Sequence, residues 1–406
     1  MTSVIADQIE IPANVPKELV INQSYEAYAM AGNDPFKAIA RLHQGPGIYW
    51  TPNIGFGEPG WFITRNDYVR EAFTHWQDFS SDYRALEVLG IPWKLNPIEF
   101  DPPEHTAYRN ILNPIFSPAS VVKMDEAVKA ACFDLIAKFE DRGSCEFISE
   151  FGEVFPAQIF LDVIGMPKEQ LAQFLVWERS MLRESDPQKR VGSMMAILQF
   201  IKAFVAEQKQ NPTSDLMSAM VGAKLNGERP LTDEEILGMC YLFYIGGLDT
   251  VYSMLGWIFR HLANDLPLQD RLRANPEDIP KAVEEFLRCY GVASPTRRAR
   301  QDFEFHGIQF KAGDVIKLCT PAASRDPLAY DDPDTVNIDR GARYLAFATG
   351  PHMCLGMHLA RREMRVVIEA FLSKFKNIRM IAGEEYQYHT GGIFGVDKLM
   401  LTWDRI

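Results

Sequence analysis

The sequence is poor in the features that mark nucleic-acid binders, disulfide-stapled secreted proteins and membrane proteins. Its 42 lysines and arginines are outnumbered by 54 acidic residues, and a net charge of −12 gives no general attraction to nucleic acid or anionic membranes. Six cysteines in 406 residues, with no CxxC pair, suggest reduced thiols. The first residues lack the basic segment followed by an apolar one that marks a signal peptide. The longest uncharged apolar stretch, residues 236–245, is too short to span a membrane. We therefore expect a soluble, cytoplasmic protein without stable membrane association.

A flavin or nicotinamide fingerprint is also missing. The clustered glycines near a helix lie in the middle of an apolar run, without the strand, turn and helix that a dinucleotide-binding loop needs. Any electrons that the protein uses must then come from a separate protein.

Helical patterns dominate what is present. Residues 1–60 are rich in proline, glycine and asparagine and predict an irregular segment with short helices, whereas residues 107–265 are mainly helical. Residues 303–310 alternate around a turn, and together with residues 314–318 they predict a hairpin. No repeat or flexible linker divides the chain. The expected fold class is mainly α with small β-sheets (α+β).

The clearest helix has an unusual middle. Thr232 and Glu235 form a capping-box pattern, and the helix could run to about residue 264, roughly 50 Å at about 1.5 Å per residue. Gly246, Gly247 and Asp249-Thr250 interrupt its apolar pattern, and each glycine costs about 1 kcal/mol against alanine. The glycines indicate either close packing or a helix break, or an opening where a large group lies against the backbone beside a hydroxyl.

Residues 344–363 place a glycine- and proline-containing loop, then Cys354, then an amphipathic helix. Unpaired N–H groups and the positive end of the helix dipole would favour thiolate over thiol at Cys354. Gly350 would permit a tight turn, and Gly356 would let a flat macrocycle approach the chain. The alternative is that Cys354 is a buried structural thiol, as most lone cysteines are.

Five positions, Phe347, Gly350, His352, Cys354 and Gly356, resemble the haem-binding signature of the cytochrome P450 family. Three further segments are similar to motifs of this family and occur along the chain in the family's order. They are residues 101–109, Gly247 with Asp249 and Thr250, and Glu285-Phe286-Leu287-Arg288 with Arg340. The resemblance covers about residues 79–403. It implies one domain over residues 1–406, a long central helix over the haem, and heme b with Cys354 as the axial thiolate of the iron.

The resemblance also implies roles for other residues. Candidates for the haem propionates are His105, Arg109, Arg297 and His352, with Arg298 as the alternative to Arg297. Thr250 would place its hydroxyl beside the oxygen that reacts, and Asp249 would relay protons from solvent. The alternative for Thr250 is a hydrogen bond back to a helix carbonyl.

Three segments, residues 246–251, 302–307 and 354–363, are similar to the camphor-hydroxylating group within the family. That group has a substrate-anchoring tyrosine near the position of Trp93, and this chain has no tyrosine between Tyr83 and Tyr108. The resemblance places the substrate contacts at Trp93, Leu242, Ile245, Ala293, Ile393 and Phe394, and the alternative for each of them is an ordinary core residue. We therefore expect a compact terpenoid or norisoprenoid substrate, such as an ionone-like or camphor-like ketone.

The implied activity is a haem-thiolate monooxygenase that uses O2, with electrons from a 2Fe-2S ferredoxin and its reductase. Arg109, Arg361 and Arg362 would form a basic face that receives the acidic ferredoxin. The alternatives are a peroxygenase that uses hydrogen peroxide, a haem-based sensor or carrier, and a metal-free cysteine hydrolase or thiolase.

Overall fold

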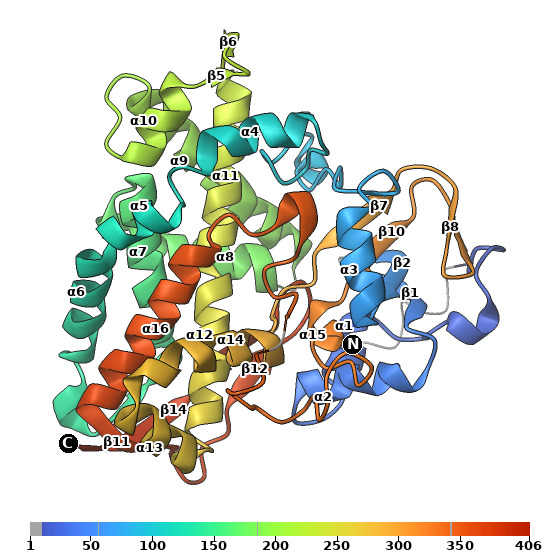
Figure 1. The fold of residues 1–406 in the computed structure, drawn as a ribbon. Helices are drawn as coiled ribbons and strands as arrows, with labels where there is room; N and C mark the ends of the chain where they lie inside the picture. The colour runs from blue at the N-terminus through green and yellow to red at the C-terminus, as the bar shows by residue number, and fades with distance from the viewer. Residues whose placement is uncertain (1–9, 56, 185, 342) are drawn as a thin grey trace. The chain divides into compact units, whose positions relative to one another are not determined.

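The computed structural model describes residues 10–55, 57–184, 186–341 and 343–406, and the chain forms two compact units (Figure 1). Unit 1 comprises residues 1–83, 280–354 and 387–397, and unit 2 comprises residues 84–279, 355–386 and 398–406. Each unit is assembled from separate stretches of sequence, so no single linker divides the chain. One domain over residues 1–406 stays a prediction. The mainly α fold class is confirmed, since about 51% of the residues are helical.

Unit 1 is built on a five-stranded sheet with the order β1-β2-β10-β7-β3. Only the β10–β2 pair is parallel, with Ile316 opposite Trp61. Apolar side chains of β1, β2 and β10 pack with those of α3 in one buried cluster, which gives the sheet a covered face. The strands are β1 (Ile48–Gly55), β2 (Glu58–Ile63), β3 (Phe79–Ser80), β7 (Thr296–Ala299) and β10 (Val315–Leu318).

Short helices and two further strand pairs complete unit 1. The helices are η1 (Lys17–Leu19), α1 (Tyr25–Ala29), α2 (Pro35–Ala40), η2 (Arg41–Gln44), α3 (Asn66–Thr74), α14 (Ile279–Cys289), α15 (Thr320–Ala323) and η8 (Gly350–His352). The paired strands are β8 (Phe303–Phe305) with β9 (Ile308–Phe310), and β12 (Gln387–His389) with β13 (Gly395–Lys398).

Two expectations for unit 1 need correction. Residues 48–55 form β1 and residues 58–60 begin β2, although Pro52, Gly55 and Gly57 hide the strand pattern in the sequence. The expected hairpin is confirmed for β8 and β9, whose turn places His306 and Gly307 at positive φ. Residues 314–318 are not part of that hairpin, because β10 pairs instead with β2 and β7.

Unit 2 is mainly helical. Its helices are η3 (Glu87–Leu89), α4 (Glu104–Leu112), α5 (Pro118–Lys123), α6 (Asp125–Ile136), η4 (Glu140–Arg142), η5 (Ile148–Gly152), α7 (Val154–Ile164), η6 (Lys168–Gln170), α8 (Leu171–Arg183), α9 (Pro187–Gln208), α10 (Asp215–Gly222), α11 (Asp233–Leu248), α12 (Thr250–Leu262), α13 (Leu266–Ala274), η7 (Pro276–Asp278) and α16 (Met357–Lys374). Its strands are β4 (Ser144–Glu146), β5 (Lys224–Leu225), β6 (Arg229–Pro230), β11 (Phe375–Met380) and β14 (Met400–Arg405), with β11-β14-β4 as a sheet.

The expected central helix is confirmed, with a break. Thr232 Oγ1 accepts from the Glu235 N–H, and Glu235 accepts from the Thr232 N–H, so the capping box is complete. Asp249 separates α11 from α12. The combined stretch of 30 residues is long and apolar enough to cross a membrane, but 67% of its apolar window is buried inside the protein. That burial is typical of a core helix.

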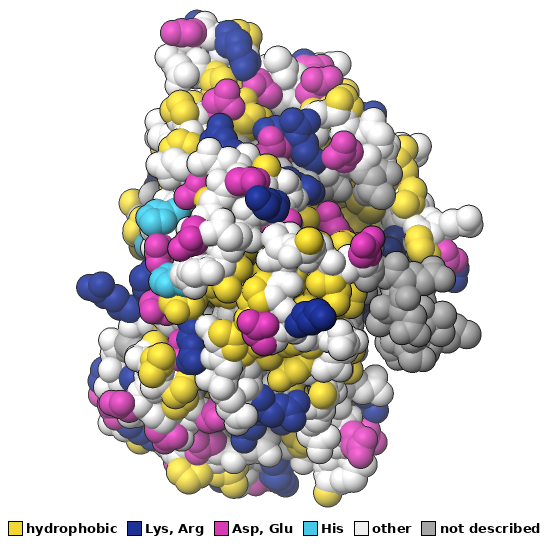
Figure 2. All heavy atoms as spheres, turned by 90° about the vertical axis from the view of Figure 1, so that its right-hand side faces the viewer, with side chains coloured by type: hydrophobic (Ala, Val, Ile, Leu, Met, Phe, Trp, Pro, Cys, Tyr) yellow, Lys and Arg dark blue, Asp and Glu magenta, His cyan; other side chains and the backbone are white. Residues whose placement is uncertain are grey.

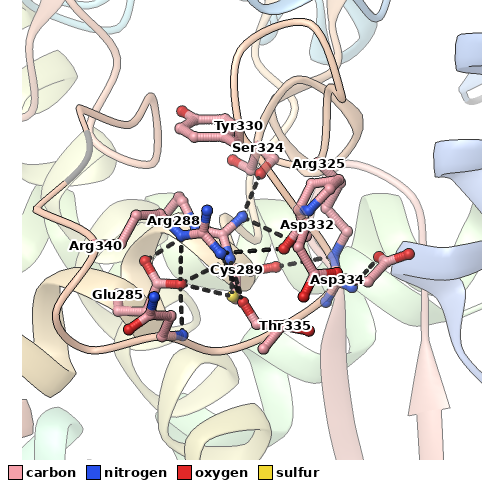
Figure 3. Close-up of polar contacts among 12 residues, drawn as sticks. Glu285, Arg288, Cys289, Ser324, Arg325, Tyr330, Asp332, Asp334, Thr335 and Arg340 are labelled. Carbon is pink, nitrogen blue, oxygen red and sulfur yellow. Dashed lines mark hydrogen bonds and ion pairs between the residues drawn. The ribbon is translucent and has the colours of Figure 1, made fainter.

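Charged side chains of α14 hold the irregular segment that leads to the cysteine loop (Figure 3). Glu285 and Arg288 form a buried pair with two hydrogen bonds of 2.8 and 3.0 Å. The Arg288 guanidinium also donates to the carbonyls of Ser324, Pro333 and Thr335. Arg340 donates to Glu285 at 3.1 Å, so its predicted place in the network is confirmed.

Substitution of Arg288 with methionine should destabilise the protein. Methionine fills a similar volume but leaves the buried Glu285 carboxylate without its main cation and three carbonyls without a donor. A broken buried pair costs about 3–5 kcal/mol, so a large fall in Tm is expected by differential scanning fluorimetry. The control is Lys129→Met, which removes an exposed partner of Asp125 and should barely change Tm. An unchanged Tm for Arg288→Met would show that the network carries no stability.

Candidate functional site

The loop before Cys354 is tightly closed on itself in unit 1. The Cys354 N–H donates to the Phe347 carbonyl at 2.9 Å, and η8 lies between these two residues. Gly350 has a φ of +71°, and an added Cβ would lie 2.9 Å from the Phe73 carbonyl oxygen. The tight turn therefore requires glycine, as the sequence predicted. In the sequence, α16 begins three residues after Cys354, with Gly356 as its N-cap residue.

Cys354 differs from the other five cysteines in its exposure. Cys132, Cys145, Cys240, Cys289 and Cys319 are buried, whereas Cys354 is exposed. Burial raises the pKa of all five, to about 12 for the thiols at 132 and 240 and about 11 at 289, which keeps them protonated at neutral pH. The exposure of Cys354 argues against the structural-thiol alternative and leaves its sulfur accessible to a ligand.

The propionate candidates of unit 1 lie on β7 and η8. Arg297 is buried, and its guanidinium donates to the Thr296 carbonyl and lies over the Phe73 ring. Arg298 instead pairs with Glu58 at 3.6 Å, because neighbouring side chains of a strand point to opposite faces. The Nε2 atom of His352 lies 3.0 Å from Ser81 Oγ. The surroundings of Arg297 therefore suit an anion ligand better than those of Arg298.

The propionate candidates of unit 2 lie on α4, the helix expected after residues 101–103. His105 is buried on this helix, and Arg109 is half-buried, with its Nε donating to Asn113 Oδ1 at 3.0 Å. Arg362, predicted to belong to a basic docking face, forms an ion pair with Asp125. Its charge is thus partly neutralised.

The two glycines of α11 have different surroundings. A Cβ on Gly247 would collide with the Phe160 ring, so this glycine permits close helix packing. A Cβ on Gly246 would meet nothing within 4 Å. The packing interpretation therefore holds for Gly247, and the open-backbone interpretation holds for Gly246.

Thr250 follows that open position. Its hydroxyl donates to the Gly246 carbonyl at 3.1 Å, which is the back-bonding alternative considered for this residue. The bond uses the hydroxyl proton and leaves the oxygen lone pairs able to accept from another donor. Back-bonding thus fixes the direction of the hydroxyl at the open turn.

Asp249 is buried beside a cation that the sequence reasoning missed. Arg183 of α8 forms an ion pair with Asp249 at 2.7 Å, and Ser253 Oγ lies 3.5 Å from the same carboxylate oxygen. A buried carboxylate is costly without a cationic partner, so a buried Asp249 requires a nearby cation. The available signal was the three charged residues, Glu178, Arg179 and Arg183, within an otherwise largely apolar helical stretch.

The predicted substrate contacts fall into two groups. Trp93, Leu242 and Ile245 are partly buried and pack against one apolar cluster of unit 2. In unit 1, Ala293 and Ile393 are joined by an antiparallel bridge and are partly exposed. Phe394 is fully buried and packs on aromatic rings of α1 and α2, which gives it the contacts of a core residue. Its contacts give no support to a substrate role.

Figure 2 shows acidic and basic side chains interspersed over one face, with apolar ones between them, so the net negative charge does not form a continuous field there. Among the described residues, no group of three or more His, Cys, Asp or Glu side chains is arranged to hold a bare metal ion. A single cysteine ligand fits iron that is already held in a macrocycle, because the macrocycle supplies the other in-plane ligands.

Comparisons with known proteins agree on one family. The Cytochrome P450 family model matches residues 168–382. The chain is 34% identical to the probable cytochrome P450 127A1 of Sinorhizobium fredii over 97% of each chain, and 30% identical to a steroid C26-monooxygenase of Mycobacterium tuberculosis over 71% of this chain and 79% of the relative. The crystal structure of CYP101J2 matches with a TM-score of 0.86 and 30% identity over 98% of this chain and all of the other. The crystal structure of CYP101C1 matches with a TM-score of 0.86 and 29% identity over 97% and 100%. The chain belongs to the cytochrome P450 family of haem-thiolate monooxygenases.

Proposed function

We propose that this bacterial-type cytochrome P450 hydroxylates a compact apolar terpenoid or norisoprenoid, with O2 and with electrons from a 2Fe-2S ferredoxin. The observation that carries the proposal is the exposed Cys354 in a loop closed by the Cys354–Phe347 hydrogen bond. Haem iron with a thiolate ligand supplies the activation of O2. The buried position of α11 and α12 supports a soluble, cytoplasmic protein without stable membrane association.

In this proposal Cys354 is the axial ligand, and four basic side chains hold the propionates. These side chains are Arg297, His352, His105 and Arg109. Arginine suits this task, because its planar guanidinium can hold a carboxylate with two hydrogen bonds. The guanidinium of Arg297 is buried and lies over the Phe73 ring, and its planar donors suit a contact with a carboxylate.

Cys354→His should change the ligand class of the haem. A thiolate gives the reduced CO adduct a red-shifted Soret band, whereas an imidazole ligand does not. The wild-type protein should show the thiolate band and the variant should lose it, as measured by optical difference spectroscopy. Cys319→Ser is the matched control, because Cys319 is a buried thiol and its loss should leave the band in place. A thiolate band that persists in Cys354→His would sink the assignment.

The proposed reaction consumes two protons for each molecule of O2, since O2, two electrons, two protons and R–H give R–OH and water. The position of Asp249, a buried acid at the break between α11 and α12, supports a proton-relay role for it. The orientation of the Thr250 hydroxyl at the open turn beside Gly246 supports a positioning role for that residue. A positioned donor matters more here than a strong base.

The proposed electron donor docks through Arg109 and neighbouring basic residues. Arg109→Glu should slow reduction by ferredoxin far more than reduction by dithionite, a small reagent that needs no docking surface. The control Lys202→Glu makes the same charge change at an exposed position of α9 and should affect neither rate. Stopped-flow measurement of both reductants decides the matter. Equal losses with both would mean that the Arg109 variant damaged the haem site.

The proposed substrate preference depends on Trp93, which offers bulk and an indole N–H where the related group has a tyrosine. A missing hydrogen bond costs about 1 kcal/mol net, whereas apolar burial contributes roughly 25 cal/mol per Å², so a few extra carbons outweigh it. An ionone should bind more tightly than camphor, and Trp93→Tyr should shift the balance toward camphor. Optical titration of the spin-state shift measures both affinities.

The matched control for this preference is Trp177→Tyr, the same change at another tryptophan packed against the apolar cluster of unit 2. It should leave the ionone-to-camphor ratio unchanged. Tight binding of camphor to the wild-type protein, with one hydroxylated product, would show that another group anchors the ketone.

A further inference from the structure

A second acid lies next to the Arg183–Asp249 ion pair in unit 2. Glu178 is on α8, five residues or about 1.4 helical turns before Arg183, and only 2% of its surface is exposed. Its Oε1 atom is buried and has no hydrogen-bond partner. An ionised carboxylate with a buried oxygen that accepts no hydrogen bond is energetically costly, so the site favours the protonated, neutral form of Glu178.

The charges around Glu178 do not balance if every acid is ionised. Arg183 pairs with Asp249, and Arg179 pairs with Glu153 at 2.6 Å. These two ion pairs use both arginines and leave Glu178 as the third carboxyl. One proton on any of the three carboxyls makes the cluster neutral.

The pKa of Glu178 agrees with that arrangement. Burial raises it to about 8, and the nearby carboxylate of Asp249 raises it as well, while Arg183 lowers it. Burial also raises the pKa of Glu153, although Arg179 opposes that change. Arg183 therefore lies near three acids: it forms an ion pair with Asp249, and it lowers the pKa of Glu178 and of Glu153.

We propose that Glu178 is a proton-holding residue that resupplies Asp249, with Arg183 as the counterion that the two carboxyls share. This inference rests on the proposed oxygenase function and names a group through which its protons pass. Glu178 acts through Asp249 and is therefore a positioning residue of the proton path. Its side chain is not expected to contact the substrate.

The proposed exchange is balanced in charge and in protons. Protonated Glu178 gives its proton to the Asp249 carboxylate and becomes a carboxylate itself, so the net charge beside Arg183 does not change. Asp249 passes the proton on, and Glu178 takes another from solvent. The side chain of Arg179, which is 53% exposed, marks the solvent side of this cluster.

The other groups packed around the cluster do not supply that proton. Tyr244 donates to the Phe174 carbonyl at 2.6 Å, and burial raises its pKa far above neutral. Tyr252 lies under the guanidinium of Arg183, with 5.3 Å between the guanidinium carbon and the ring centroid. Ser253 reaches only Asp249. Glu178 is thus the group of the cluster that can hold a proton at pH 7 and release it.

Glu178→Gln tests the exchange, because glutamine keeps the shape and cannot give up a proton. A group whose pKa is raised to about 8 carries its proton below pH 8 and loses it as the pH rises through 8. Wild-type turnover at saturating reductant should therefore fall as the pH rises through about 8. The variant should lack that step and turn over roughly tenfold slower at pH 7, less than the about 10²–10⁴-fold usual for a group that touches the reacting atoms.

Infrared spectroscopy provides a readout that does not depend on turnover. The wild-type protein should show the C=O band of a protonated carboxyl at pH 7 that disappears near pH 8, and Glu178→Gln should lose this band. Glu363 is the matched comparison, since it is a second buried acid of unit 2 with a pKa raised to about 8. Glu363→Gln should retain the part of the band that belongs to Glu178. Glu178→Asp, which keeps a carboxyl, should restore part of the turnover.

Each result separates the inference from the function on which it rests. A pH step that persists in Glu178→Gln and disappears in Glu363→Gln would overturn the inference. Unchanged turnover in Glu178→Gln would also overturn it, while product formation would still support the oxygenase. A wild-type protein without a thiolate CO adduct would instead contradict the proposed function itself.

Discussion

The cysteine loop depends on the buried guanidinium of Arg288, which donates hydrogen bonds to one carboxylate and three backbone carbonyls. Residues 324–349 hold almost no regular secondary structure among the residues described, so their backbone groups cannot bond one another in a helix or sheet. Arg288 gives three of their carbonyls a donor, and Glu285 accepts from the Asn337 N–H. Glu284, on the same helix, accepts from the Tyr344 hydroxyl. One helix thus supports the chain that leads to Cys354.

The chemistry of unit 2 depends on the same rule, that a buried charge must be paired. In the Glu285–Arg288 network every charged group has a partner, and the result is a rigid support. Around Asp249, the three carboxyls at 153, 178 and 249 face two arginines, at 179 and 183. In our proposal, this one additional carboxyl is what distinguishes a proton-carrying network from a structural one.

Local rules account for what the sequence predicted correctly. The capping box at Thr232, the turn at Gly350 and the Glu285–Arg288 pair depend on residues within a few positions of one another, and the structure has all three. Composition alone does not distinguish Cys354 from the other five cysteines, such as Cys319. Motif spacing singled out Cys354, and the structure adds that Cys319 is buried whereas Cys354 is exposed.

Contacts between distant segments explain what could not be predicted. The pairing of β10 with β2 joins residues about 255 positions apart, and no local pattern encodes it. Arg183 and Asp249 are 66 residues apart, so their meeting depends on how α8 packs against the end of α11. Phe394 is an apolar aromatic residue of the kind that lines substrate pockets, but its ring packs against Phe36 as in a core. Apolar side chains serve both purposes, and only packing separates them.

Close packing and an open backbone are both found in the central helix, because each applies to a different glycine. Gly247 lets Phe160 pack closely against the helix. Gly246, the preceding residue, has open space at its Cβ position, and its carbonyl accepts from the Thr250 hydroxyl. An alanine at 247 would push the helix away from Phe160, whereas one at 246 would only fill the open space. The hydroxyl is therefore directed by a backbone that close packing at the next residue holds in place.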